Sequence, residues 1–255
     1  MTTMTTPSAR VPILTYHGRN VFGSAYANND HVALASDLQT ITARGWRIAP
    51  LTDVVDAFLA GRVPRDTLCL TFDDGTDYDV RALDDPDHGL QPGLLNLLAA
   101  FQARHPGAQP GLRGTAFVIA SPDARHAMDV ECVHGRGWMG ETWWKDAVDG
   151  GLMDIGNHSW DHNHEAVPVV AQRNQQKGNF HCIDSEADAE AQIRQAHAYI
   201  AARAPCAAND LFCYPYGHVA PYLRDTYLPA QAASAKPFVR AAFGTDAGCL
   251  TPTSD

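Results

Sequence analysis

Long apolar runs, clusters of basic residues and closely paired cysteines are all missing from this chain. No segment reaches the roughly 18 consecutive apolar residues of a membrane-spanning helix, so we expect no membrane span. The formal net charge is -10, and no basic stripe offsets it, which argues against a nucleic acid partner. The six cysteines include no Cys-x-x-Cys pair, so neither a zinc ribbon nor a thioredoxin-type site is expected.

The N-terminus lacks the basic start and apolar run of a secretory signal peptide. The sequence as it stands therefore predicts a cytoplasmic protein, and an extracytoplasmic location stays open if a leader was removed. We expect residues 1–10 to be disordered. Residues 11–255 are expected to form one domain, because 255 residues that are 45% hydrophobic can bury one large core. The sequence does not determine the oligomeric state.

Short apolar runs alternate with helical patterns along the chain. The expected strands are 11–16, 46–49, 68–72, 115–120, 152–155, 211–214 and 238–243. The expected helices are 31–44, 52–60, 93–104, 141–148 and 185–203, with Thr52 and Ser185 as N-caps. This alternation predicts a parallel sheet covered by helices, and the number of units favours an α/β barrel. Ligands of such sheets bind at the carboxyl ends of the strands.

Two aspartates, Asp73 and Asp74, directly follow the apolar strand 68–72 and precede Gly75. Adjacent carboxylates raise each other's pKa, and a metal cation bound to one of them relieves that cost. The other carboxylate is then free to accept a proton. An Asp-Asp-Gly sequence is often only a turn, but the preceding buried strand brings this pair to the edge where ligands bind.

Two histidines four residues apart, His158 and His162, follow the strand 152–155. If the first turn after the strand is helical, this spacing puts both imidazoles on one face. Two imidazoles and one carboxylate form a set that zinc fills well, with an open position for water. The competing pair His162 and His164 would converge only in an extended segment. Asp161 is expected to hold a ring nitrogen. The alternative interpretation is a histidine-rich surface loop.

The segment Tyr214-Pro215-Tyr216-Gly217 directly follows the apolar residues 211–213. Proline fixes one backbone dihedral and glycine frees another, so this segment is a turn of defined shape. Tyr216 could offer a backbone N–H to a developing oxyanion and an aromatic face to a sugar, whereas an ordinary turn is the alternative. His17, at the end of the first strand, either faces the same edge or is a structural histidine.

Three of these segments together resemble one family. In chain order, they are similar to the first three motifs of the polysaccharide deacetylases of carbohydrate esterase family 4, the NodB-homology domain: Thr71-Phe72-Asp73-Asp74-Gly75, His158-Ser159-x-x-His162 and Tyr214-Pro215-Tyr216-Gly217. Tyr16-His17 also resembles the opening strand of many members. The similarity covers nearly the whole chain and is closest to the branch that partly deacetylates poly-N-acetylglucosamine.

This resemblance implies a distorted (β/α)7 barrel and a metal-dependent hydrolase that removes N-acetyl, and possibly O-acetyl, groups from a polysaccharide or oligosaccharide. It implies that Asp73 is the general base and that Tyr216 lines the sugar site and gives its amide to the oxyanion. The implied metal ligands, usually for zinc, are Asp74, His158 and His162. The implied substrate contacts are Tyr216, Pro215 and Trp160.

Two features depart from the family pattern. Many members carry an arginine just before the third motif that orients the base, but the nearby positions here are Asp210 and Cys213. Many members also carry a late Leu-x-His motif that supplies the general acid, and no histidine follows His218. The candidates for that acid are His17, His164 and the reprotonated Asp73.

Three other functions remain open. Two histidines and a carboxylate also form the iron site of non-haem oxygenases, although those triads usually lie on an all-β scaffold. A small-molecule amidase could use the same scaffold, with the polar loop 166–184 shaping its pocket. The missing arginine and acid histidine would also fit a non-catalytic carbohydrate-binding relic, which the intact Asp and His residues oppose.

Overall fold

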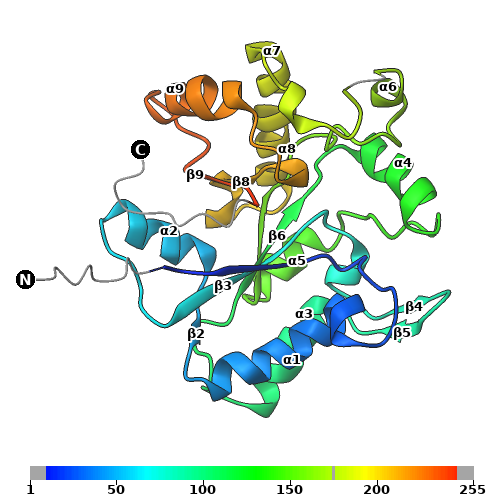
Figure 1. Cartoon of the computed structure of the whole chain (residues 1–255), viewed down its shortest axis with the longest axis vertical. Coiled ribbons are helices and arrows are strands. Elements are labelled where there is room, and N and C mark those ends of the chain that lie inside the picture. Colours follow the sequence, from blue (N-terminus) through cyan, green and yellow to red (C-terminus); the bar gives the residue numbers. More distant parts are fainter. Residues whose placement is uncertain (1–9, 174–175, 246–255) are drawn as a thin grey trace, which may run out of the picture.

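One parallel sheet of seven strands organises the molecule, and the computed structural model describes residues 10–173 and 176–245 of the chain. The order of the strands is β1 (Ile13–Tyr16), β3 (Thr67–Phe72), β6 (Gly114–Val118), β7 (Met153–Asn157), β8 (Leu211–Cys213) and β9 (Ala241–Phe243), and β2 (Arg47–Ile48) pairs with the start of β3. The sheet curls with helices around it (Figure 1), which confirms the distorted α/β barrel. The expected disordered segment 1–10 lies outside the described residues, apart from Arg10.

The outer face of the sheet packs against helices. Because side chains alternate along a strand, Leu68, Leu70 and Phe72 of β3 point to this face and lie in the largest core cluster. The helices that cover it are α1 (Asp30–Ala43), α3 (Leu94–Arg104), α5 (Trp144–Asp149) and α8 (Gln195–Arg203). Of these, α1 and α3 lie side by side below the sheet in Figure 1.

The inner face of the sheet packs against α2 (Leu51–Leu59) and the segment before β8. Val54 of this helix packs in a second cluster with Cys69 of β3 and Phe117 of β6, and this cluster also takes in side chains of β1, β8 and β9. The expected N-cap Thr52 is wrong, since the helix begins at Leu51 and Pro50 stands at the cap position. With the interior packed, the open space is left at the strand ends.

Several elements were not expected from the sequence. They are α4 (Pro122–Cys132), α6 (Pro168–Ala171), α9 (Leu228–Ala232) and the antiparallel hairpin of β4 (Leu83–Asp85) and β5 (Gly89–Gln91). Ser121 caps α4, and Pro122 occupies its first turn, where the missing N–H has no consequence. Ser185 is confirmed as a cap, because its hydroxyl accepts from the Asp188 backbone N–H at the start of α7 (Glu186–Ala189).

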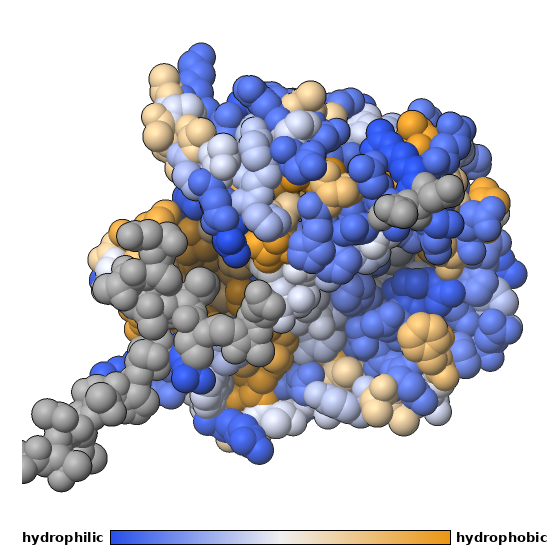
Figure 2. All heavy atoms as spheres, turned by 45° about the horizontal axis from the view of Figure 1, so that its top comes forward, coloured by the Kyte–Doolittle hydropathy of each residue, from blue (hydrophilic) through white to orange (hydrophobic). Residues whose placement is uncertain are grey.

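The five cysteines within the described residues are all free thiols. In the same part of the chain, no helix combines the length and the apolar character needed to cross a bilayer. On the face drawn in Figure 2, hydrophilic side chains predominate, and apolar ones gather in a hollow on the left.

Candidate active site

A cavity of about 450 Å³ lies where the parallel strands end. Residues that follow four different strands line it, because all parallel strands end at the same edge of the sheet. His17 follows β1, and Asp73 and Asp74 follow β3. His158 and His162 follow β7, and Tyr216 follows β8. The segments that the sequence analysis singled out separately therefore share one cavity.

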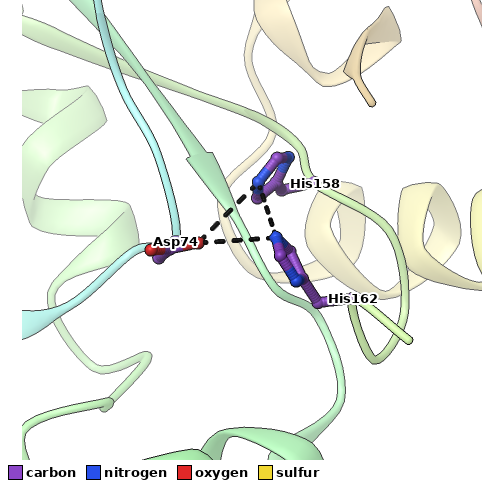
Figure 3. A group of neighbouring side chains, drawn as sticks. All are labelled: Asp74, His158 and His162. Atoms are coloured by element: carbon purple, nitrogen blue, oxygen red, sulfur yellow. Dashed lines mark hydrogen bonds and ion pairs between the residues drawn. The ribbon is translucent and has the colours of Figure 1, made fainter. Parts of the chain in front are cut away.

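Asp74, His158 and His162 converge within this cavity. Asp74 Oδ1 lies 3.8 Å from His158 Nε2 and 3.6 Å from His162 Nε2, and the two Nε2 atoms are 3.2 Å apart. In Figure 3 the carboxylate comes from one loop and faces two imidazoles that come from another. The three ligand atoms lie within 4.8 Å of one another, which is compact enough for one metal ion.

The loop that carries the histidines is not helical, so the expected helical turn is wrong. Ser159 and His162 have positive φ angles of 72° and 60°. Side chains hold this conformation: Asn157 Oδ1 accepts from the Ser159 N–H at 2.8 Å, and Ser159 Oγ accepts from the His162 N–H at 3.0 Å. The two imidazoles therefore meet through a side-chain-braced loop rather than through helical spacing.

The hydrogen bonds of His158 fit a metal ligand. His158 Nδ1 lies 2.9 Å from the carbonyl oxygen of Cys213, which can only accept, so Nδ1 carries the proton and Nε2 has a free lone pair. His162 Nε2 faces that lone pair and must donate a proton to it unless a cation lies between the rings. His162 Nδ1 has no partner among the described residues. This donor set of two nitrogens and one oxygen matches a zinc site.

The charge states of these groups also suit a cation. Burial, reinforced by the neighbouring His158, lowers the pKa of His162 well below its ordinary value, so this ring stays neutral. Burial alone would raise the pKa of Asp74, whereas positive charge on the surrounding histidines, or on a cation in their place, lowers it. A neutral imidazole and an ionised carboxylate are the forms that bind metal ions.

Asp73 lies beside the cluster and is buried. Its backbone N–H donates to the Tyr16 carbonyl at 3.1 Å, which joins the end of β3 to β1. Its Oδ1 has no hydrogen-bond partner among the described residues, and its Oδ2 lies 3.8 Å from the Cys213 thiol. Burial raises the pKa of Asp73, and the adjacent Asp74 adds to this rise. Cys213 therefore lies beside the carboxylate that matches the one oriented by an arginine in many family members.

Two other residues of the histidine loop, Asp161 and His164, lie outside the three-residue cluster. Asp161 was expected to hold an imidazole nitrogen, but its Oδ1 accepts from Gln192 Nε2 at 2.7 Å and from the Asn163 N–H at 2.8 Å. That expectation is wrong, because the loop turns the carboxylate away from the rings. His164 lines the cavity but lies outside the three-residue cluster, and its Nδ1 accepts from the Ala166 N–H.

Of the three expected substrate contacts, Tyr216 lines the cavity, whereas Pro215 and Trp160 do not. Tyr216 lines the cavity, is 38% exposed and has a positive φ of 59°, with its ring 4.3 Å from that of His162. Pro215 is buried behind it and is not part of the cavity wall. Trp160 is also absent from the wall, because it packs against Tyr199 at 5.5 Å on the outer side of the sheet.

One wall of the cavity was missed by the sequence analysis. It consists of apolar residues from the end of α4 and the segment after it: Met128, Cys132, Val133 and Met139. Arg19 lines the cavity as well, and its Nε donates to the Cys132 carbonyl at 2.7 Å. The only signal for this wall was the Ser121-Pro122 pair, a common start of a helix.

Comparisons with known proteins agree with this geometry. A family model for polysaccharide deacetylase matches residues 60–234, which is more than half of the chain. No curated protein sequence matched the chain.

Solved structures that resemble the chain include three deacetylases. The BpsB deacetylase domain from Bordetella bronchiseptica has 15% identity and a TM-score of 0.56, over 98% of this chain and 94% of that one. BC0361, a polysaccharide deacetylase from Bacillus cereus, has 14% identity and a TM-score of 0.56, over 95% and 60%. PplD from Streptococcus pyogenes, solved with acetate, has 15% identity and a TM-score of 0.52, over 83% and 76%. Identities this low show the fold alone.

Proposed function

The chain belongs to the polysaccharide deacetylase family, and on that premise we propose that it is a metal-dependent hydrolase that removes acetyl groups from a carbohydrate. One observation carries the proposal: Asp74, His158 and His162 converge beside the buried Asp73 in one cavity. The substrate is an acetylated polysaccharide or oligosaccharide, with N-acetyl as the first group to test and O-acetyl as the second.

The metal ligands in this proposal are Asp74, His158 and His162, and zinc suits their two nitrogens and one oxygen. When bound, such an ion lowers the pKa of a water molecule and polarises the carbonyl oxygen of the acetyl group. The protein's part is to keep the buried His162 neutral and to direct the Nε2 lone pairs of both imidazoles at one point. The Cys213 carbonyl orients His158, because it accepts a hydrogen bond from Nδ1–H and so leaves the Nε2 lone pair free.

Asp73 is the general base of this mechanism. It takes a proton from the water as the oxygen attacks the acetyl carbon. Two features support this role: its Oδ1 has no other hydrogen-bond partner among the described residues, and burial raises its pKa, which makes its carboxylate a stronger base. The Tyr216 N–H is the donor that we assign to the oxyanion, and one such donor is worth about 3 kcal/mol.

The departing nitrogen needs a proton, and we assign this step to His17. His17 lines the cavity and is close enough to lower the pKa values of both Asp73 and Asp74. Its backbone N–H donates to Asp30 Oδ2 at 2.7 Å, which fixes the turn after β1. His164 is the weaker candidate, because its Nδ1 is engaged by a backbone N–H.

The test is acetate release by Asp73→Asn from acetylated oligosaccharides, measured together with zinc content. We expect the variant to keep zinc and to lose at least a hundredfold in kcat, in line with a lost general base. Asp87→Asn, a change at an exposed aspartate, is the control and should match the wild type. Normal turnover by Asp73→Asn would show that another group is the base.

Metal content, oxygen consumption, acetate release and glycan binding together separate the other functions. Ferrous iron with oxygen consumption would support an oxygenase, and acetate release from small amides but not from glycans would support an amidase. Glycan binding without any hydrolysis would indicate a non-catalytic relic.

A further inference from the structure

A row of aromatic rings leads from the metal-ligand cluster to the surface. The ring of His162 lies 4.3 Å from that of Tyr216, and Tyr216 lies 5.3 Å from His218. His218 stacks on His181, with ring centroids 4.5 Å apart and planes only 16° from parallel. Tyr216 lines the cavity and His181 is exposed, so the row continues the cavity wall outwards.

The outer end of the row is held in place by buried groups. Phe180 is fully buried and packs against Phe212 of β8, while its backbone N–H donates to His218 Nδ1 at 3.3 Å. The Asn179 side chain accepts from the His181 N–H at 3.0 Å, and the Asn179 carbonyl accepts from the buried Asn163 at 2.8 Å. An exposed ring on so well anchored a backbone is preorganised, which lowers the entropy cost of binding a ligand.

The chemistry of the row suits a neutral sugar. None of its side chains is acidic, lysine or arginine. Burial and the neighbouring His181 lower the pKa of His218, and since its Nδ1 accepts a hydrogen bond, its Nε2 is left as a donor. Ring faces therefore meet the C–H surface of a sugar, and imidazole edges meet its hydroxyls.

We propose that Tyr216, His218 and His181 form a binding subsite for the sugar next to the one that loses its acetyl group. This inference rests on the proposed function. It implies that the substrate is an oligomer, because a single sugar at the metal cluster would leave His218 and His181 without contacts.

The test compares the wild type with a His181→Ala/His218→Ala double variant on N-acetylglucosamine and its tetramers, in both the β-1,4 and the β-1,6 linkage. The measured quantity is the ratio of kcat/KM for the better tetramer to kcat/KM for the monosaccharide. We expect the double variant to lower this ratio about tenfold, the order expected for lost aromatic contacts. His181→Phe, which keeps an aromatic ring, should retain most of the wild-type ratio.

His88→Ala is the control, since His88 is exposed and lies on the β4–β5 hairpin connection, and it should leave the ratio unchanged. An unchanged ratio in the double variant, or an equal fall in His88→Ala, would overturn the proposal. Calorimetric Kd values for the tetramers give a second readout. If the wild type releases no acetate, the proposed function is wrong. The subsite is then tested by binding alone: a tetramer Kd about tenfold weaker in the double variant supports it, and an unchanged Kd contradicts it.

Discussion

The loop after β3 and the loop after β7 both bring the proposed metal ligands to the cavity through positive φ angles, but they differ in what fixes this backbone. After β3, Asp74 has a φ of 76° and Gly75 a φ of 74°. After β7, Ser159 and His162 have φ angles of 72° and 60°. A left-handed conformation is costly for residues with a side chain, so each loop needs a compensating interaction.

In the first loop, the backbone at Gly75 passes so close to Val118 that there is no room for a side chain. A Cβ atom on Gly75 would lie 2.7 Å from Val118 Cγ1 and 3.1 Å from Val118 Cα. The second loop depends on hydrogen bonds, in which Asn157 and Ser159 accept from backbone N–H groups at 2.8 Å and 3.0 Å. A single added methyl group should therefore destabilise the first loop strongly. The loss of one hydrogen bond should destabilise the second loop only in part.

The largest effect is expected for Gly75→Ala. The positive φ and the contact with Val118 together should lower the free energy of unfolding by about 3 kcal/mol, measured by urea denaturation. Gly89→Ala is the matched control, because Gly89 has a φ of 71° but nothing within 4 Å of its Cβ position. It should cost about 1 kcal/mol. Equal losses of stability in the two variants would show that the close contact with Val118 does not contribute to the effect of Gly75→Ala.

Metal binding should couple the two loops. Zinc at about a hundredfold its Kd should raise the free energy of unfolding of the wild type by about 2.7 kcal/mol, and a chelator should reverse this gain. Asp74→Ala removes a ligand from the first loop and His158→Ala removes one from the second, so each should abolish most of the gain. A variant that keeps the full zinc stabilisation would exclude that residue as a ligand.

A smaller effect is expected for Ser159→Ala, which removes the bond to the His162 N–H. We expect zinc affinity to fall about tenfold by calorimetry, with a loss of about 1 kcal/mol in stability. Ser185→Ala removes the cap of α7 and should cost similar stability without changing zinc affinity. If the two serine variants bind zinc equally, the hydrogen bonds of the second loop do not orient its ligands.

The smallest effect is expected away from both loops, at Glu141. Burial alone would raise its pKa, but hydrogen bonds from Tyr199 and Arg203 and the charge of Arg125 hold that pKa below 4.5. A lowered carboxyl pKa stabilises the folded state above its unfolded value, and this contribution is lost as the pH falls through the folded value. Glu141→Gln should therefore cost about 1 kcal/mol near neutral pH and progressively less in acid. Zinc affinity should not change in Glu141→Gln. A change would show that metal binding by the two loops depends on the contacts of Glu141.

The same comparison explains how much could be predicted from the sequence. The apolar strand β3 and the aspartates after it gave a clear local signal, since strand, turn and glycine are adjacent in the chain. His158 and His162 were found by their spacing, but their conformation was predicted wrongly, because side-chain bonds to the backbone override helical periodicity. The family resemblance implies a substrate contact for Trp160, yet the loop turns it towards Tyr199.

Features that depend on distant contacts could not be predicted. Helix α4 has only a narrow apolar stripe of Ala124, Met128 and Cys132. Its buried side also carries Arg125, paired with Glu141, and Asp129, which accepts from the Trp138 N–H at 2.7 Å. Its apolar residues at the cavity were therefore missed. The contact of Cys213 with Asp73 joins residues 140 positions apart, which no local pattern encodes.

Anomalous diffraction at the zinc absorption edge, from crystals grown with zinc, tests the central claim most directly. We expect a single ion at the carboxyl ends of β3 and β7, about 2.0–2.2 Å from Asp74 Oδ1, His158 Nε2 and His162 Nε2. An ion bound elsewhere, or no ion in the cavity at saturating zinc, would contradict the claim.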